Sequence, residues 1–314
     1  MNKTRRYTYA TSLATLVVLG SVFYLYPNTQ LAYAHTFSGN ESSAFIATIG
    51  VLRTEIRLIN STISTNASQA NEHAKIAVEH LSKNDTTQLA ERNQRIATDL
   101  PKDLSDLQNM TANLSPTNMT GITAIKQKVS DTDALLSEAL SVRVEPNQLT
   151  NATVYGTAVA DLLNETLERY GEAVGIGENA SSASSATGGN SSSSSNATTS
   201  ANTTASMSNN TATIENYADY QSTIGLVNMT KETLNQTKSL MNATSTNSSA
   251  IAKVDNDLNQ LKTLIENKSS YTQVATFVYD TTYPDLNSAF GLGLQKVDAA
   301  SAIEEAKSAK EEEG

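Results

Sequence analysis

Residues 45–63, FIATIGVLRTEIRLINSTI, carry the pattern that decides the fold of this 314-residue chain. The apolar residues alternate spacings of four and three, at Phe45, Ile49, Leu52, Ile56, Ile59 and Ile63. Because an α-helix turns once in about 3.6 residues, this spacing puts all of them on one helical face. The stretch therefore predicts a helix with a single buried stripe.

Similar apolar stripes predict further helices on both sides of a polar stretch in the middle of the chain. Pro101 is expected to kink one helix, Pro146 suits the first turn of another, and Pro284 falls inside the last. The expected helices cover residues 69–81, 88–113, 122–139, 146–171, 213–241, 249–268 and 274–290. The helix over 249–268 has a short heptad seam at Ile251, Val254, Leu258, Leu261 and Ile265.

The composition changes sharply between the two sets of helices. Residues 176–212 are Ser, Thr, Asn, Ala and Gly with almost nothing apolar, so we expect a disordered linker. The predicted fold class is all-α, with two antiparallel helical bundles at 35–175 and 213–298 joined by that linker. Residues 299–314 form an acidic tail, and residues 1–34 precede the first bundle.

The overall composition narrows the chemistry. The chain has no cysteine, which excludes disulfides, thiol catalysis and thiolate metal sites. Its aromatic content is 5%, which favours cores of Leu, Ile, Val and Ala in helices. The formal net charge of -10 is unfavourable for binding nucleic acid, so no nucleic-acid partner is expected.

The N-terminus has the features of an export signal. Lys3, Arg5 and Arg6 precede an apolar run at residues 10–26, which is followed by the small-residue site Ala32-Tyr33-Ala34. Cleavage after Ala34 would release the protein, whereas retention of the run, about 17 residues, would leave a transmembrane helix as an anchor. In both cases the rest of the chain lies outside the cell, because the basic residues remain on the cytoplasmic side.

Acceptor tripeptides for N-glycosylation, Asn-x-Ser/Thr and called sequons below, agree with export. They recur in every segment that follows the export signal, although frequent Asn, Ser and Thr also produce some by chance. Their asparagines are Asn40, Asn60, Asn66, Asn84, Asn109, Asn113, Asn118, Asn151, Asn164, Asn179, Asn190, Asn196, Asn202, Asn209, Asn228, Asn235, Asn242, Asn247 and Asn267.

The three histidines suggest a metal site as an alternative. Cleavage after Ala34 would make His35 the N-terminal residue, whose amine and imidazole are nitrogen ligands for copper. His73 and His80 lie on one helical face but rise about 10.5 Å apart, too far for a chelate of their own. His35, Glu72, Glu79 or a carboxylate from another helix would have to complete the site. The simpler interpretation is that both histidines pack at the boundary of the core and form hydrogen bonds.

No sequence motif for catalysis is found. The chain has no G-x-S-x-G, no phosphate-binding glycine loop, no H-E-x-x-H and no calcium loop, so we expect a protein that is not an enzyme and needs no cofactor.

Three segments carry a resemblance. They are His35-Thr36-Phe37-Ser38-Gly39-Asn40-Glu41, the stretch from Glu72 through His80 to Leu81, and Val142-Arg143-Val144-Glu145-Pro146 leading to Ala160-Asp161-Leu162. They resemble uncharacterised exported helical proteins of ammonia-oxidising archaea, over about residues 35–175. The resemblance implies an archaeal cell envelope and no particular activity.

The sequence thus predicts an exported or membrane-anchored glycoprotein of the cell surface with a non-enzymatic binding or structural role and an unidentified envelope partner. The alternative is an extracytoplasmic copper-binding or other metal-binding protein that uses His35, His73 and His80.

Overall fold

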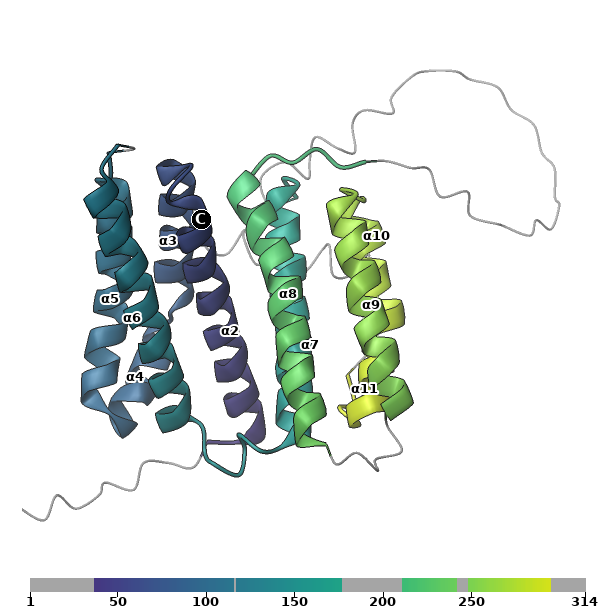
Figure 1. Cartoon of the computed structure of the whole chain (residues 1–314). Helices are drawn as coiled ribbons and strands as arrows, with labels where there is room; N and C mark the ends of the chain where they lie inside the picture. Colours follow the sequence, from purple (N-terminus) through teal and green to yellow (C-terminus); the bar gives the residue numbers. More distant parts are fainter. Residues whose placement is uncertain (1–36, 116, 177–210, 242–247, 295–314) are drawn as a thin grey trace, which may run out of the picture. The chain divides into compact units, whose positions relative to one another are not determined.

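The computed structural model describes residues 37–115, 117–176, 211–241 and 248–294, and these residues are all-α, as predicted (Figure 1). An isolated antiparallel bridge joins Thr211 to Ser269. The helices are α2 (Gly39–Thr62), α3 (Ala67–His80), α4 (Lys83–Arg92), α5 (Gln94–Ala112), α6 (Met119–Arg143), α7 (Ala152–Ala173), α8 (Tyr217–Leu240), α9 (Ser248–Glu266), α10 (Tyr271–Phe277), the π-helix η1 (Val278–Thr282) and α11 (Tyr283–Phe290).

Several predictions fall on residues outside these ranges. They are the export signal or anchor at 1–34, His35, most of the linker at 176–212, the tail at 299–314, and the sequons at Asn179, Asn190, Asn196, Asn202, Asn209, Asn242 and Asn247. Within the described ranges, no helix combines the length and apolar character needed to cross a bilayer.

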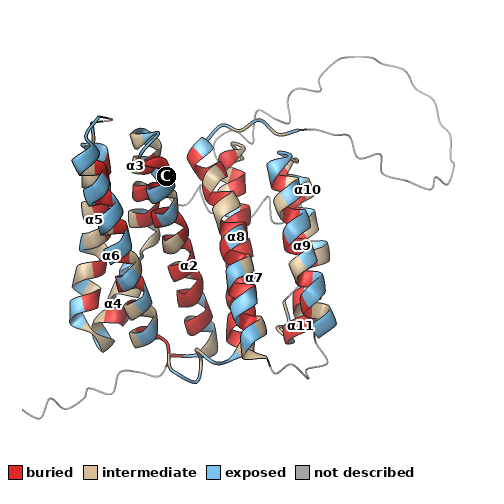
Figure 2. Cartoon of the chain, viewed as in Figure 1, coloured by how far each residue is buried: buried red, intermediate tan, exposed pale blue. Residues whose placement is uncertain are grey.

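The apolar stripe of residues 45–63 is confirmed as the buried face of α2. Its six members are all between 0% and 2% exposed. The helix begins at a capping box, in which the hydroxyl of Ser38 accepts from the amide of Glu41 and the Glu41 carboxylate accepts from the amide of Ser38. Figure 2 shows the same division along the other helices, with buried residues facing neighbouring helices and exposed residues facing outward.

The helix predicted over 88–113 is divided in two, and the division is at Asn93. This residue ends α4 and caps α5, because its extended backbone (φ -156, ψ 99) stops one helix while its side chain accepts from the amides of Arg95 and Ile96. The helix α5 then continues through Pro101. Pro146 also differs from expectation, since it lies in the turn before α7, which begins at Ala152.

The last predicted helix is interrupted before Pro284. A single π-helical turn, η1, separates α10 from α11, and the amide of Tyr283 donates to the carbonyl of Val278, five residues back. Proline has no amide hydrogen and its ring crowds the carbonyl four residues earlier. The wider turn immediately before Pro284 is a common response of a helix to such a conflict.

The core does not divide at the boundary that the sequence suggested. One apolar cluster involves α2 to α6 and the start of α7, and a second involves the rest of α7 with α8 to α11. A third, small cluster of Ala47, Val51, Leu162, Leu226 and Met229 joins α2, α7 and α8. Since α7 belongs to both large clusters and the described residues form one compact unit, two separate bundles are not confirmed.

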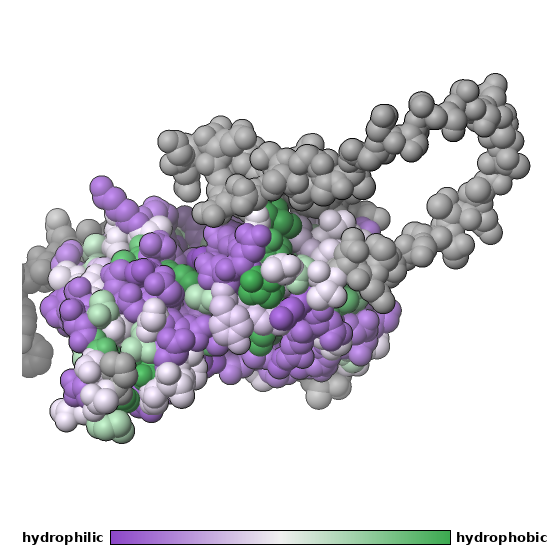
Figure 3. All heavy atoms as spheres, turned by 90° about the horizontal axis from the view of Figure 1, so that it is seen from above, coloured by the Kyte–Doolittle hydropathy of each residue, from purple (hydrophilic) through white to green (hydrophobic). Residues whose placement is uncertain are grey.

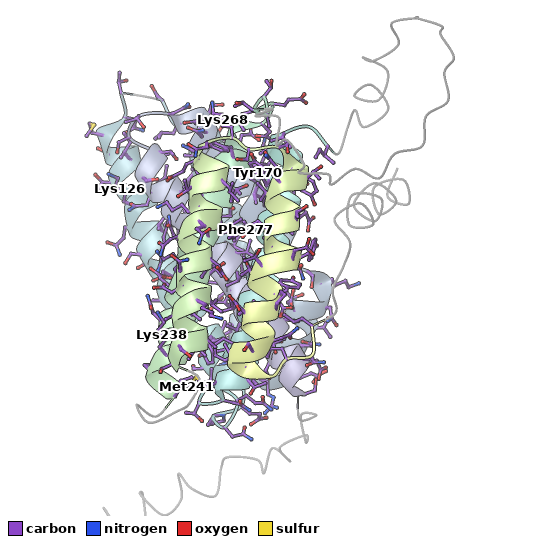
Figure 4. The ribbon with its side chains drawn as sticks, turned by 90° about the vertical axis from the view of Figure 1, so that its right-hand side faces the viewer. Lys126, Tyr170, Lys238, Met241, Lys268 and Phe277 are labelled. Atoms are coloured by element: carbon purple, nitrogen blue, oxygen red, sulfur yellow. The ribbon has the colours of Figure 1, made fainter. Side chains whose placement is uncertain are left out.

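Tyrosine side chains connect the later helices to α7. The hydroxyl of Tyr170, near the end of α7, donates to the carbonyl of Ser269 between α9 and α10. Figure 4 shows Tyr170 at this end, near Lys268, and Phe277 farther along the face made by α9 to α11. The hydroxyl of Tyr283 likewise lies 2.5 Å from Oδ1 of Asn164 on α7. The later helices are therefore fixed to α7 along its length.

Candidate functional site

A buried hydrogen-bonded contact between a histidine and a glutamate links the first two described helices. Nδ1 of His73 on α3 lies 2.8 Å from Oε2 of Glu55 on α2, and both side chains are 0% exposed. Nε2 of the same ring lies 2.9 Å from Oε1 of Gln221 on α8. Both ring nitrogens of His73 are therefore engaged in hydrogen bonds inside the protein, one to a carboxylate and one to a side-chain amide.

Small residues allow the three helices to approach at this point. Ala70, Ala74 and Ala77 surround His73 on the buried face of α3, each 0% or 1% exposed. On α8, a Cβ added to Gly225 would lie 2.5 Å from Cγ2 of Thr54, next to Glu55 in sequence. Close packing at these small residues brings α3 and α8 against α2, where His73 contacts both helices.

A second histidine contact is neutral. Nδ1 of His80 lies 3.9 Å from Oε2 of Glu165 on α7. Burial, followed by the charge of Arg169, lowers the pKa of His80 to about 4. Burial, followed by the charge of Glu168, raises the pKa of Glu165 to about 7. At neutral pH the imidazole is uncharged, so the two side chains do not form an ion pair despite their proximity.

A charged pocket lies where α7 ends and α8 begins, with α3 beside them. Its volume is about 540 Å³, and its lining includes the acidic residues Glu72, Glu79, Glu172, Glu215 and Asp219. The guanidinium of Arg169 lies 2.7 Å from Glu172 and 3.5 Å from Asp219. Figure 3 shows this end of the molecule, where hydrophilic residues predominate among the described ones.

Burial raises the pKa of one residue in this pocket. The Asp219 side chain is 7% exposed, and its burial, followed by the charge of Glu172, raises its pKa to about 6. Tyr217 lines the same pocket and is 59% exposed. The pocket can accept a small polar group. It is separate from the His73 contact, because neither Glu55 nor His73 is among its lining residues.

The histidines named by the copper hypothesis do not converge in the described part of the chain. His73 uses both ring nitrogens in hydrogen bonds, His80 lies beside Glu165, and Glu72 pairs with Lys75 at 2.9 Å. A search of the described residues for three or more His, Asp or Glu side chains in a metal-binding arrangement finds none. His35, the third histidine of that hypothesis, lies outside the described residues.

The sequon asparagines that the structure describes all have exposed side chains. They occur in three settings: inside helices, at helix ends and in the first turn of a helix. Asn60, Asn109, Asn164, Asn228 and Asn235 lie inside helices, while Asn66, Asn118 and Asn151 are the N-caps of α3, α6 and α7. The remaining four are Asn40, Asn84, Asn113 and Asn267.

Sequence reasoning missed the partners of His73. Glu55 had a detectable signal, because it is a carboxylate next to the apolar stripe, one residue before Ile56 and three after Leu52. Gln221 had none, since it lies 148 residues from His73 in sequence. A further missed residue is Arg143, which is 1% exposed and has its guanidinium carbon 3.2 Å from the centre of the Phe37 ring.

Comparisons with protein-family models, with curated proteins and with solved structures find no match to this chain.

Proposed function

We propose that this chain is an exported or membrane-anchored helical glycoprotein of the cell surface with a non-enzymatic binding or structural role. One observation carries the proposal. In the described residues the acceptor asparagines are all exposed, whereas the pair best suited to acid–base chemistry, Glu55 and His73, is 0% exposed. Modifiable groups thus lie on the outside and reactive groups serve the packing of helices.

The buried pair supports a structural role because its hydrogen-bonding capacity is directed inward. Both nitrogens of His73 contact protein oxygens, on α2 and on α8. A general base must be within reach of a substrate proton, and this imidazole is 0% exposed.

The sequons support exposure to a glycosylating compartment. Their asparagines occur on α2, α4, α5, α7 and α8 and at several helix ends, so they are distributed over the described surface. Saccharide attached at those asparagines that a transferase can reach would enlarge a polar surface without entering the apolar clusters. The export signal proposed for residues 1–34 provides the route to that compartment.

A membrane-impermeant amine-reactive reagent tests the location on intact cells. Lys75, Lys102 and Lys238 are partly exposed, with 43%, 65% and 35% of each side chain accessible. We expect labelling of these lysines without lysis, and a cytosolic protein as control remains unlabelled. Labelling only after lysis would refute a surface location. Fractionation of the same cells separates a released form from an anchored form.

A further inference from the structure

Helical geometry separates the two functional groups of a sequon. Successive residues on an α-helix are about 100° apart, so an asparagine and the hydroxyl residue two positions later are about 200° apart. When the asparagine faces outward, the hydroxyl residue faces inward. A transferase that needs access to both residues cannot reach them together on a folded helix.

The five sequons inside helices follow this rule. Each exposed asparagine is followed two positions later by a buried threonine whose hydroxyl donates to the carbonyl four residues back. The threonines and their exposures are Thr62 at 7%, Thr111 at 2%, Thr166 at 0%, Thr230 at 0% and Thr237 at 0%. These tripeptides are explained by the alternation of surface asparagine and core threonine on amphipathic helices.

The three sequons at helix N-caps have the opposite geometry. Both the asparagine and the hydroxyl residue are exposed, because the asparagine precedes the helix. Oδ1 of Asn151 accepts from the amide of Thr153, at 2.9 Å, within the sequon itself. Oδ1 of Asn66 and of Asn118 accepts from the third residue of the helix, at 3.1 Å and 2.9 Å. In all three, Nδ2 donates to no described residue.

The other described sequons each lack part of this geometry. Ser42, in the sequon of Asn40, is 0% exposed. Nδ2 of Asn113 donates to the carbonyl of Asn109 at 2.8 Å. The hydroxyl residues that follow Asn84 and Asn267 are half-buried. Only the N-cap sequons, among those that the structure describes, present an available Nδ2 and an exposed hydroxyl residue together.

We propose that, in the described part of the folded protein, N-linked saccharide is attached at Asn66, Asn118 and Asn151. The donor class is a saccharide activated as a lipid-linked phosphate or diphosphate. Nδ2 bonds to the anomeric carbon, the bond from that carbon to the phosphate oxygen breaks, the lipid phosphate leaves, and Nδ2 loses one proton to a base. Oδ1 is not consumed, so each modified asparagine still caps its helix.

This inference rests on the proposed function, and site occupancy tests the two separately. Glycopeptides of the protein isolated from its own cells are quantified at each described sequon. We expect occupancy at Asn66, Asn118 and Asn151 at least several-fold above that at Asn60, Asn109, Asn164, Asn228 and Asn235. Equal or higher occupancy inside the helices would overturn the assignment of these three sites, although the protein would still be a glycoprotein. A protein without saccharide anywhere would overturn the proposed function itself.

Matched variants remove a sequon without removing its cap. Ser68→Ala, Thr120→Ala and Thr153→Ala change exposed residues and leave the capping asparagines in place. Each is expected to lose the saccharide mass at one site, whereas Thr120→Ser and Thr153→Ser retain it. Unchanged mass in the alanine variants would contradict the assignment. An Asn228→Asp variant, which removes a sequon inside α8, is expected to leave the mass of attached saccharide unchanged.

Discussion

Nδ1 of His73 lies 2.8 Å from Oε2 of Glu55, and neither side chain has any exposed surface. The contact joins α3 to α2, and the hydrogen bond from the same ring to Gln221 adds α8. Two segments on opposite sides of residues 177–210 are thereby connected inside the protein. The packing of α8 against the first helices thus depends on polar contacts as well as on the small apolar cluster of α2, α7 and α8.

Removing one partner of this pair is expected to destabilise the fold strongly. In Glu55→Ala the buried His73 ring loses its hydrogen-bond partner at Nδ1, and the expected loss is about 1–3 kcal/mol of unfolding free energy. The double variant Glu55→Ala, His73→Ala should cost clearly less than the sum of the two single variants, since no buried partner is left unpaired when both side chains are removed. Denaturant titration of the four proteins measures this. Additive losses would show that the two residues are not coupled.

An exposed ion pair provides the control for that experiment. Arg57 and Glu232 lie 2.8 Å apart, with side chains 52% and 58% exposed. Water screens such a contact, so Glu232→Ala should cost less than about 1 kcal/mol. A loss comparable with that of Glu55→Ala would show that burial does not set the strength of these contacts.

Cutting the chain between residues 177 and 210 should leave the two parts associated. A protease site inserted there allows the full protein to be cleaved after folding. We expect the two fragments to elute together in size-exclusion chromatography, because α8 packs against α2, α3 and α7 through buried residues. Separate elution of two folded fragments would favour the two independent bundles that the sequence suggested.

The stability of the protein should increase as the pH falls from about 8 to about 5. Burial raises the pKa of Glu165 to about 7 and those of Asp161, Asp219 and Asp257 to about 6. The unfolded chain holds these groups near 4, so the folded protein binds more protons in this interval and gains stability. The melting temperature measured across this pH range checks the direction.

The opposing effect of His80 and a variant of Glu165 make the pH prediction more specific. His80 acts in the opposite sense, because its folded pKa of about 4 lies below its usual 6.5 and the unfolded chain takes up that proton first. The unfolded chain is half-protonated at this residue by pH 6.5, so its effect is smallest in the interval from pH 8 to 7, which is left mainly to Glu165. In Glu165→Gln the melting temperature should change less over this interval than in the natural protein. An unchanged profile would contradict the role of Glu165.

Two glycines should respond in opposite directions to substitution by alanine. Alanine favours a helix over glycine by about 1 kcal/mol when nothing obstructs its methyl group. At Gly225 the new Cβ would lie 2.5 Å from Cγ2 of Thr54, so Gly225→Ala should destabilise the protein by forcing α8 away from α2. At Gly171 the nearest atom is 3.4 Å away, an ordinary contact, so Gly171→Ala should be neutral or stabilising. Thermal unfolding distinguishes the two.

The helices were predictable wherever their buried faces are apolar. The stripe of α2 and the seam of α9 are both buried as the spacing indicated. The buried face of α8 is less visible in the sequence, because Thr223, Thr230 and Thr237 belong to it and satisfy their hydroxyls on the helix backbone. The break at Asn93 was missed because an asparagine cap stops a helix without the composition of a loop.

The buried site could not be predicted because its parts come together only in the folded protein. His73 was recognised as packing or hydrogen-bonding in one of two interpretations, but its partners are 18 and 148 residues away. Likewise, sequence alone detects the sequons and does not separate them by the exposure of the hydroxyl residue. That separation depends on where each helix begins. N-cap asparagines such as Asn151 set that point.

The intact mass and N-terminal sequence of the protein purified from its own cells test the proposed function most directly. The unmodified chain has a mass of 33.5 kDa. We expect a mass increased by whole saccharide units over the residues that remain, with an N-terminus at His35 in a released protein or near Met1 in an anchored one. A single species with the mass of the unmodified, full-length chain would contradict the proposed function.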